Sequence, residues 1–157
     1  MKISTLSNSE TADLVERLKT AWPAGSVSRV KSLKKYEIDE AKSLFVSDEI
    51  SAVKVNDSLV PFLGKTELVQ KFPTVTVDMG AIRFVCNGAK VLRPGIVAFD
   101  SFKKGDVVAV KDQTHGKLLA VGLALEDSET AKSMAKGYVV DNLHHVGDKV
   151  WEAAKEI

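Results

Sequence analysis

The chain has 157 residues, a formal net charge of +1 and 45% hydrophobic residues, which is enough to bury one sizeable core or two small ones. So small a net charge excludes a generally basic protein that coats nucleic acid, and no apolar run approaches the roughly 20 residues that span a bilayer. The single cysteine, Cys86, excludes an internal disulfide framework. Because the first residues (MKISTLSNSETADLVERLKT) are too polar for a signal peptide, we expect a cytoplasmic protein that contacts no membrane.

Positive charge is concentrated near the N-terminus. Residues 1–36 contain seven basic and three acidic side chains, a local sum of +4, so the remainder of the +1 chain sums to −3. The densest part contains Arg29, Lys31, Lys34 and Lys35. Such a cluster is able to neutralise phosphates as an accessory basic patch, but an ordinary solvated surface is the simpler interpretation.

The first predicted elements lie within residues 1–72. Ser7 and Glu10 form a capping-box pattern at the start of a helix, and Pro23-Ala24-Gly25 ends it. The apolar stripe of that helix consists of Leu14, Val15, Leu18, Ala21 and Trp22. Short strand-like runs follow up to residue 64, and residues 65–72 form a short helix closed by Pro73. We therefore predict a small α+β N-terminal domain.

The second predicted domain covers residues 73–157. It begins with a strand at 74–78 and a helix at 78–88, with Asp78 as its N-cap. Further strands are expected at 90–100, 105–112, 117–126 and 138–152, and a second helix at 127–137. The order β-α-β-β-β-α-β predicts a mostly antiparallel β-barrel with flanking helices.

The strand at 90–100 is interrupted by Arg93-Pro94-Gly95. Proline lacks a backbone donor and glycine admits conformations that other residues avoid. The interruption is either a simple turn of the barrel or a place where backbone and a cation approach a ligand, and the residues alone leave both open.

Two segments resemble a known family. The segment VTVDMGAIRFVCNGAKVLRPGI resembles the opening of a PUA domain, an RNA-binding module, through Val-Asp-x-Gly-Ala followed by a helix and Gly-Ala-x-Val-x-x-Pro-Gly-Ile. The ending VVDNLHHVGDKVW is similar to the malignant-T-cell-amplified-sequence family of translation proteins, here of archaeal type. In that family a small N-terminal domain precedes a C-terminal PUA domain. The resemblance is strong over residues 75–151.

The resemblance implies an RNA-binding site on the loop between the first helix and the second strand of the PUA domain. The implied RNA-binding residues are Gly80, Ala81, Arg83, Gly88, Lys90, Arg93, Pro94 and Gly95. Glycines let backbone amides approach phosphates, and lysine and arginine add charge. The free N–H groups of residues 78–81 are also expected to admit a phosphate or a sugar.

The resemblance also implies partners. The expected RNA is tRNA or rRNA, most of all the acceptor end of tRNA on the small ribosomal subunit, during initiation or recycling. Eukaryotic relatives act with density-regulated protein, which carries a SUI-type domain, so a SUI-type partner is a further expectation.

No catalytic residue, cofactor, metal or small-molecule substrate is expected. His144 and His145 are adjacent in a strand and point to opposite faces, which disfavours a zinc site. Cys86 lies beside core residues and indicates packing rather than nucleophilic catalysis. Two alternatives to a translation protein stay open: an RNA-targeting accessory of a tRNA or rRNA modification enzyme, and a protein-interaction module that docks a translation factor.

Overall fold

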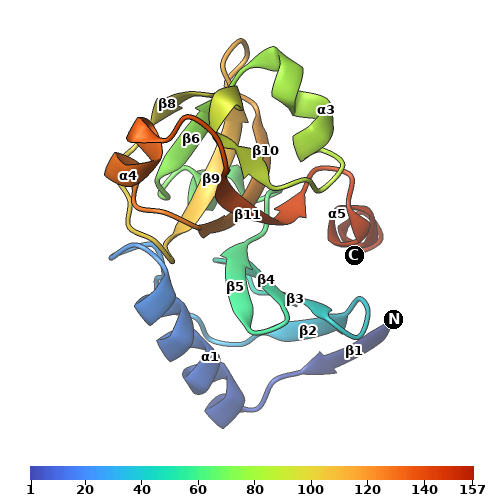
Figure 1. Ribbon diagram of the computed structural model, residues 1–157. Coiled ribbons are helices and arrows are strands. Elements are labelled where there is room, and N and C mark those ends of the chain that lie inside the picture. Colours follow the sequence, from blue (N-terminus) through green and yellow to red (C-terminus); the bar gives the residue numbers. More distant parts are fainter.

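The structure, a computed structural model, describes residues 1–157 and contains two β-sheets, one below the other in Figure 1. The lower sheet has the order β1-β2-β3-β4-β5, and all of its pairs are antiparallel. Its elements are β1 (Lys2–Thr5), α1 (Asn8–Ala21), β2 (Lys34–Glu37), β3 (Lys42–Val46), β4 (Ser51–Val55), β5 (Ser58–Pro61) and α2 (Thr66–Val69).

The upper sheet has the order β7-β11-β10-β9-β6-β8 and is antiparallel except where β6 pairs with β9. Its strands are β6 (Thr74–Val77), β7 (Val91–Leu92), β8 (Ile96–Phe99), β9 (Val107–Asp112), β10 (Leu118–Ala124) and β11 (Tyr138–His145). The helices are η1 (Met79–Ala81), α3 (Ile82–Val85), η2 (Arg93–Gly95), α4 (Ser128–Ser133) and α5 (Lys149–Ala154). The predicted mostly antiparallel, barrel-like sheet with flanking helices is thus confirmed.

Helix α1 begins where its capping residues predict. The Ser7 hydroxyl accepts from the Glu10 N–H at 3.0 Å, and the Glu10 carboxylate accepts from the Ser7 N–H at 2.9 Å. The apolar stripe ends at Trp22, which is buried and whose indole N–H donates to the Leu59 carbonyl oxygen at 3.0 Å. Ala21 is exposed, so that member of the predicted stripe does not face the core.

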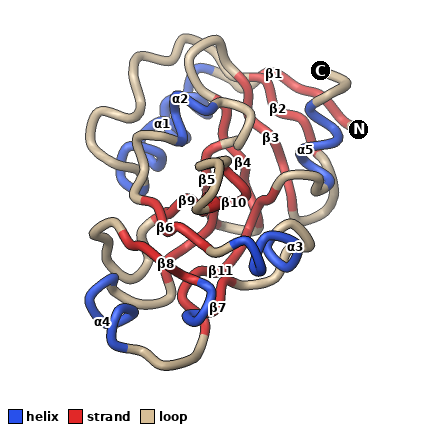
Figure 2. Tube along the Cα trace, turned by 90° about the horizontal axis from the view of Figure 1, so that it is seen from above, coloured by secondary structure: helices blue, strands red, loops and turns tan.

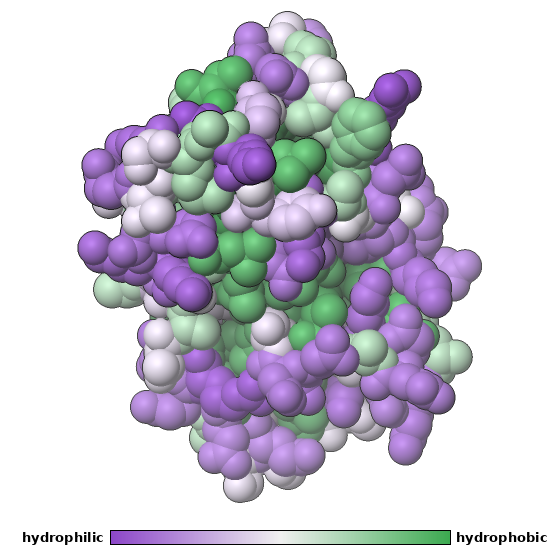
Figure 3. Space-filling view, viewed as in Figure 1, coloured by the Kyte–Doolittle hydropathy of each residue, from purple (hydrophilic) through white to green (hydrophobic).

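The buried side chains form two clusters, and the larger one crosses from the lower sheet to the upper. It contains 21 residues, mainly from the lower sheet and α1, but also residues of β9, β10 and α5 (Val107, Ala109, Val121 and Val150). The smaller cluster of 14 residues lies within the upper sheet. Figure 3 shows hydrophobic atoms across the middle of the molecule, framed by hydrophilic ones. The core therefore has no break at residue 72, and the domain boundary there stays a prediction.

His144 lies in the junction between the two sheets. Its side chain is fully buried, its Nε2 accepts from the Leu63 N–H at 3.3 Å, and its ring stacks on Phe62 with centroids 5.5 Å apart. The adjacent His145 instead lies next to Gly88, so the predicted opposite orientation of the two histidines is confirmed. His144 therefore serves packing between the sheets, whereas His145 does not take part in the junction.

Asp148 completes this junction. Its carboxylate lies 2.8 Å from His144 Nδ1 and accepts the N–H groups of Trp151 at 2.8 Å and His145 at 2.9 Å. Burial alone raises the pKa of Asp148, but the hydrogen bond and charge of His144, with the two N–H donors, lower it to about 2. The carboxylate is therefore held ionised at the start of α5.

Several predicted elements differ from the structure. The expected strand at 90–100 is divided by η2 into β7 and β8, which lie at opposite edges of the upper sheet. The expected strand at 138–152 ends at His145, because Asp148 caps α5 and turns the following residues into a helix. The expected helix at 78–88 is shorter, since it consists of η1 and the four residues of α3. Strand β1 was not expected at all, and it forms the edge of the lower sheet.

The view from above in Figure 2 shows both chain ends on one side, near β1 and α5, while α4 lies on the opposite side. None of the helices combines the length and the apolar character that crossing a membrane requires.

Candidate functional site

The upper sheet has a groove of about 610 Å³, bordered by η1, α3, β7, η2 and the first residue of β11. Gly80, Ala81, Lys90, Pro94 and Gly95 line it, so the structure brings together these members of the set expected from the sequence. A volume of this order is typical of a site for a small organic group.

Small residues let the two walls of the groove come close together. The Asp78 N–H donates to the Gly95 carbonyl oxygen at 2.9 Å, which joins β6 to the end of η2. A Cβ on Gly95 would lie 3.3 Å from the Ala81 Cβ, and one on Gly80 would lie 3.4 Å from Asp78 Oδ1. The glycines therefore serve close approach of the walls themselves.

Gly88 lies just outside the groove lining, in the loop after α3. Its φ of +90° lies in the left-handed region, and a Cβ there would meet His145 Nε2 at 3.3 Å. Asn142 of β11 supports the same loop, since its amide donates to the carbonyl oxygens of Val85 at 2.9 Å and Ala89 at 3.1 Å. Sequence reasoning missed Asn142, because its two acceptors lie more than 50 residues earlier in the chain.

Two exposed aromatic rings border the groove, and each has a cation beside it. The Arg83 guanidinium lies 5.0 Å from the centre of the Phe84 ring, and Lys90 Nζ lies 5.5 Å from the centre of the Tyr138 ring. Phe84 and Tyr138 are each 54% exposed and both line the groove. Arg83 does not line the groove itself, but it contacts Phe84, which does. The aromatic residues were missed because nothing in the sequence relates positions 84 and 138.

Arg93 is not among the residues that line the groove, and its expected contact with phosphate stays a prediction. It donates to the carbonyl oxygens of Ile96 at 3.0 Å and Lys132 at 3.2 Å, and it lies 5.0 Å from the centre of the Phe99 ring. Because Lys132 belongs to α4, the side chain connects the η2 turn to that helix. The neighbouring Pro94 and Gly95 do line the groove.

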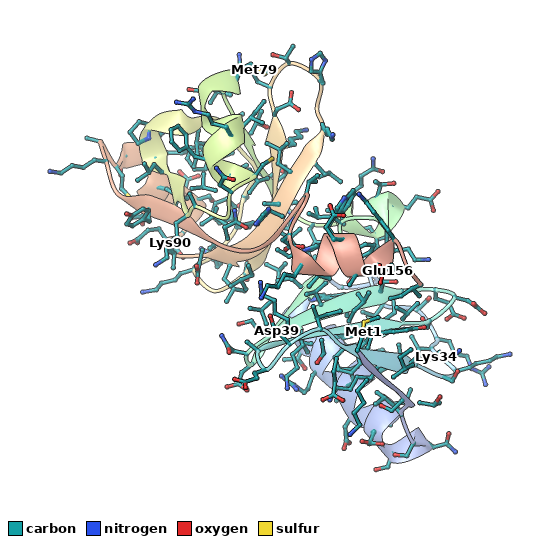
Figure 4. All side chains as sticks on the ribbon, turned by 90° about the vertical axis from the view of Figure 1, so that its right-hand side faces the viewer. Met1, Lys34, Asp39, Met79, Lys90 and Glu156 are labelled. Carbon is teal, nitrogen blue, oxygen red and sulfur yellow. The ribbon has the colours of Figure 1, made fainter.

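The basic residues near the N-terminus lie on the lower sheet, and Figure 4 shows Lys34 and Lys90 at opposite ends of the molecule. Lys31 and Lys34 border a separate hollow of about 330 Å³ that also contains Asp48 and Glu49. Lys35 lies 6.0 Å from the centre of the Phe45 ring, and Arg29 is exposed. The four cations thus do not extend the groove, and acidic side chains offset part of their charge.

Nothing in the structure gathers a metal site or an activated nucleophile. No group of three or more His, Cys, Asp or Glu side chains is placed to hold a metal ion. Burial raises the pKa of the Cys86 thiol, against a weaker opposing effect of Lys117, so the reactive thiolate is disfavoured.

Comparisons with known proteins match a PUA domain to residues 73–146. The chain is 42% identical over 117 residues to an uncharacterized protein of Methanocaldococcus jannaschii, covering 72% of this chain and 71% of that protein. It is 33% identical over 129 residues to translation machinery-associated protein 20 of Saccharomyces cerevisiae, covering 75% and 70%. A hypothetical protein of Pyrococcus horikoshii has a similar structure, with a TM-score of 0.81 at 27% identity over 97% of this chain and 99% of that one.

A shorter match concerns an enzyme. Probable tRNA pseudouridine synthase B of Saccharolobus solfataricus is 35% identical over 111 residues, which are 69% of this chain but only 41% of that protein. More than half of that enzyme therefore has no counterpart here.

Proposed function

This chain belongs to the family of PUA-domain proteins associated with translation, and we propose that its groove binds an unpaired end of a structured RNA. The chain is a non-catalytic RNA-binding protein, since it covers 70% of translation machinery-associated protein 20 but only 41% of the pseudouridine synthase.

The observation that carries the proposal is the pairing of an exposed aromatic ring with a cation at each side of the groove. An unpaired base stacks on an aromatic ring with little dependence on sequence, at about 1–3 kcal/mol per base. Arg83 beside Phe84 and Lys90 beside Tyr138 then lie where the phosphates that flank a stacked base would run. Bases inside a duplex have no free faces, so this arrangement favours an unpaired end.

The lining of the groove also favours a base over a phosphate as its occupant. Val85, Val91 and Leu92 contribute an apolar wall, and an apolar wall does not compensate a phosphate for its lost hydration. Backbone N–H groups beside Gly80 and Gly95 remain suitable for contacts to the sugar-phosphate backbone. We therefore place the base against the aromatic rings and the phosphates at the rim.

Within translation, the acceptor end of tRNA on the small ribosomal subunit fits this ligand best, because it is an unpaired segment that continues a duplex. Initiation or recycling is the proposed setting, in the cytoplasm, and a SUI-type protein is a proposed partner. Residues 1–72 form the proposed N-terminal domain, and the accessory basic patch (Arg29, Lys31, Lys34 and Lys35) is proposed to contact rRNA there. The family membership supports these proposals.

The similarity to a pseudouridine synthase keeps one alternative open, in which the chain targets a modification enzyme to tRNA or rRNA. Crosslinking the protein to RNA in its native cells and sequencing that RNA separates the two. Recovery of tRNA 3′ ends or small-subunit rRNA supports the translation role. Recovery of RNA modification sites, together with the modifying enzyme, supports the alternative.

Binding itself is tested by fluorescence anisotropy with two RNA hairpins of equal duplex, one with an unpaired 3′ end and one blunt. The protein should bind the first at least tenfold more tightly, and Tyr138→Ala should remove most of that difference. Ile3→Ala is a matched control, because Ile3 is 58% exposed on the edge of the lower sheet. Equal affinity for both hairpins would contradict the proposal.

A further inference from the structure

We propose that Asp78 selects the ligand at one end of the groove, where it accepts a hydrogen bond from a neutral donor of the bound nucleotide and excludes phosphate. This inference rests on the proposed function, because it assumes that a nucleotide occupies the groove. Asp78 then has two roles, as the N-cap of η1 and as a residue that determines ligand specificity.

The two oxygens of the Asp78 carboxylate have different surroundings. Oδ1 accepts the Ala81 N–H at 3.0 Å and so caps η1. Oδ2 has no hydrogen-bond partner in the protein, is not among the buried unpartnered atoms, and belongs to a side chain that lines the groove. Asp78 also takes part in none of the ion pairs. One lone acceptor atom with a negative charge therefore stays available to a ligand.

This arrangement changes what the start of η1 is able to bind. The sequence suggested that the free N–H groups of residues 78–81 admit a phosphate or a sugar. In the structure the carboxylate already accepts the Ala81 N–H, so a phosphate there would face a like charge without a neutralising cation. A hydroxyl or an amino group would instead donate to Oδ2, and a charged acceptor that a ligand satisfies in this way favours ligands that carry the donor.

The lining of the groove carries one charge of each sign. Asp78 and Lys90 are the two lining residues that carry opposite charges. A nucleotide in the groove therefore lies with its phosphate toward Lys90 and with a neutral donor toward Asp78.

Two parts of a nucleotide offer such a donor. The ribose has its 2′ and 3′ hydroxyls, and adenine, cytosine and guanine have exocyclic amino groups, whereas uracil has none. Asp78 shares the groove lining with Gly80 and Gly95, which carry no side chains. The shared chemistry is a neutral hydrogen-bond donor, and the experiment separates the two sources.

The test compares the wild type with Asp78→Asn, which keeps a capping oxygen and nearly the same size but removes the charge. Each protein is titrated with hairpins whose unpaired 3′ ends carry a 3′-hydroxyl, a 3′-deoxyribose or a 3′-phosphate, each with terminal cytidine or uridine. The wild type should discriminate about tenfold against ends that lack the donor or carry the phosphate. Asp78→Asn should reduce that discrimination to about twofold and should melt at the wild-type temperature.

The pattern of losses identifies the donor. Sensitivity to the 3′ substituent identifies a ribose hydroxyl, and sensitivity to the terminal base identifies an amino group, so either pattern supports the inference. Lys90→Ala is the control, because it should weaken all ends alike and leave their ranking unchanged. If the wild type and Asp78→Asn rank the ends identically, the inference is wrong although RNA binding stands. If the wild type binds none of the ends, the proposed function is wrong, and the inference about Asp78 is wrong with it.

Discussion

Replacing Arg93 by alanine should lower the stability of the fold and leave the affinity for RNA nearly unchanged. The guanidinium donates to the carbonyl oxygens of Ile96 at 3.0 Å and Lys132 at 3.2 Å. It also lies over the Phe99 ring, 5.0 Å from its centre. Because the bond to Lys132 reaches α4, 39 residues further along the chain, the side chain holds the η2 turn against a distant element.

The magnitude follows from these contacts. A hydrogen bond from a charged donor contributes about 1.5–3 kcal/mol, and we take about 1.5 kcal/mol for the part-buried bond to Ile96. The bond to Lys132 is exposed and contributes about 0.5 kcal/mol. With the contact to Phe99, the free energy of unfolding should fall by about 2–3 kcal/mol, which at this chain length lowers the melting temperature by about 4–12 °C.

Thermal melting by circular dichroism, beside fluorescence anisotropy with the 3′-tailed hairpin at two salt concentrations, measures both quantities. Arg93→Lys is a useful second variant, since it keeps the charge but loses the two-pronged geometry and should also melt early. The reasoning would be refuted by an unchanged melting temperature together with a weaker, less salt-dependent affinity for RNA. That result would return the guanidinium to the phosphate contact suggested by the sequence.

Three further predictions concern other parts of the molecule. Lys90→Ala should weaken RNA binding by about 1 kcal/mol and flatten the slope of log affinity against log salt by about one, both measured by anisotropy titration. The control Lys19→Ala, on α1, should change neither quantity. An equal effect of the two substitutions would contradict a specific contact of Lys90 with RNA. The pKa of Asp148 is lowered from 3.8 to about 2 in the folded protein. The ionised Asp148 carboxylate therefore contributes about 2 kcal/mol to the free energy of unfolding above pH 3.8, and this contribution is lost as the pH falls through about 2. Urea unfolding of the wild type and of Asp148→Asn at several pH values measures it. The same acid dependence in both proteins would contradict this assignment. A fragment of residues 73–157 should fold and show dispersed amide signals in NMR spectra. It should melt at a lower temperature than the whole chain, because it exposes side chains that otherwise pack on the lower sheet (Val107, Ala109, Val121 and Val150). A fragment without dispersed signals would contradict the prediction that residues 73–157 form a domain.

Local chemistry explains why some features could be predicted from the sequence. The capping box at Ser7 and Glu10 involves neighbours three residues apart, and both of its hydrogen bonds are present. The Gly88 position requires a positive φ, which a glycine after a helix commonly indicates. Gly88 begins the Gly-Ala-x-Val-x-x-Pro-Gly-Ile pattern, and that pattern also contains Pro94 and Gly95 of η2, which line the groove.

Features that depend on distant partners could not be predicted in this way. The direction of the Arg93 side chain is set by Lys132, and the pairing of Lys90 with Tyr138 depends on β7 and β11 lying side by side. Continuity of the core across residue 72 depends on which face of β9 and β10 packs on the lower sheet.

One missed element did carry a local signal. Residues 149–152 were expected to be extended, and they include Val150 and the aromatic Trp151, which favour strands. Asp148 precedes them, and its carboxylate accepts the Trp151 N–H three residues on, as an N-cap does. The capping residue therefore outweighed the strand preference of its neighbours.

The central claim, that the groove of the upper sheet binds the unpaired end of an RNA, is tested most directly by mapping backbone amide shifts in NMR spectra while the 3′-tailed hairpin is added. We predict that the largest changes occur at Gly80, Ala81, Lys90 and Tyr138, and that the blunt hairpin leaves these signals nearly in place. Changes confined to the lower sheet, around Lys31 and Lys34, would contradict the claim and assign RNA binding to the basic patch instead.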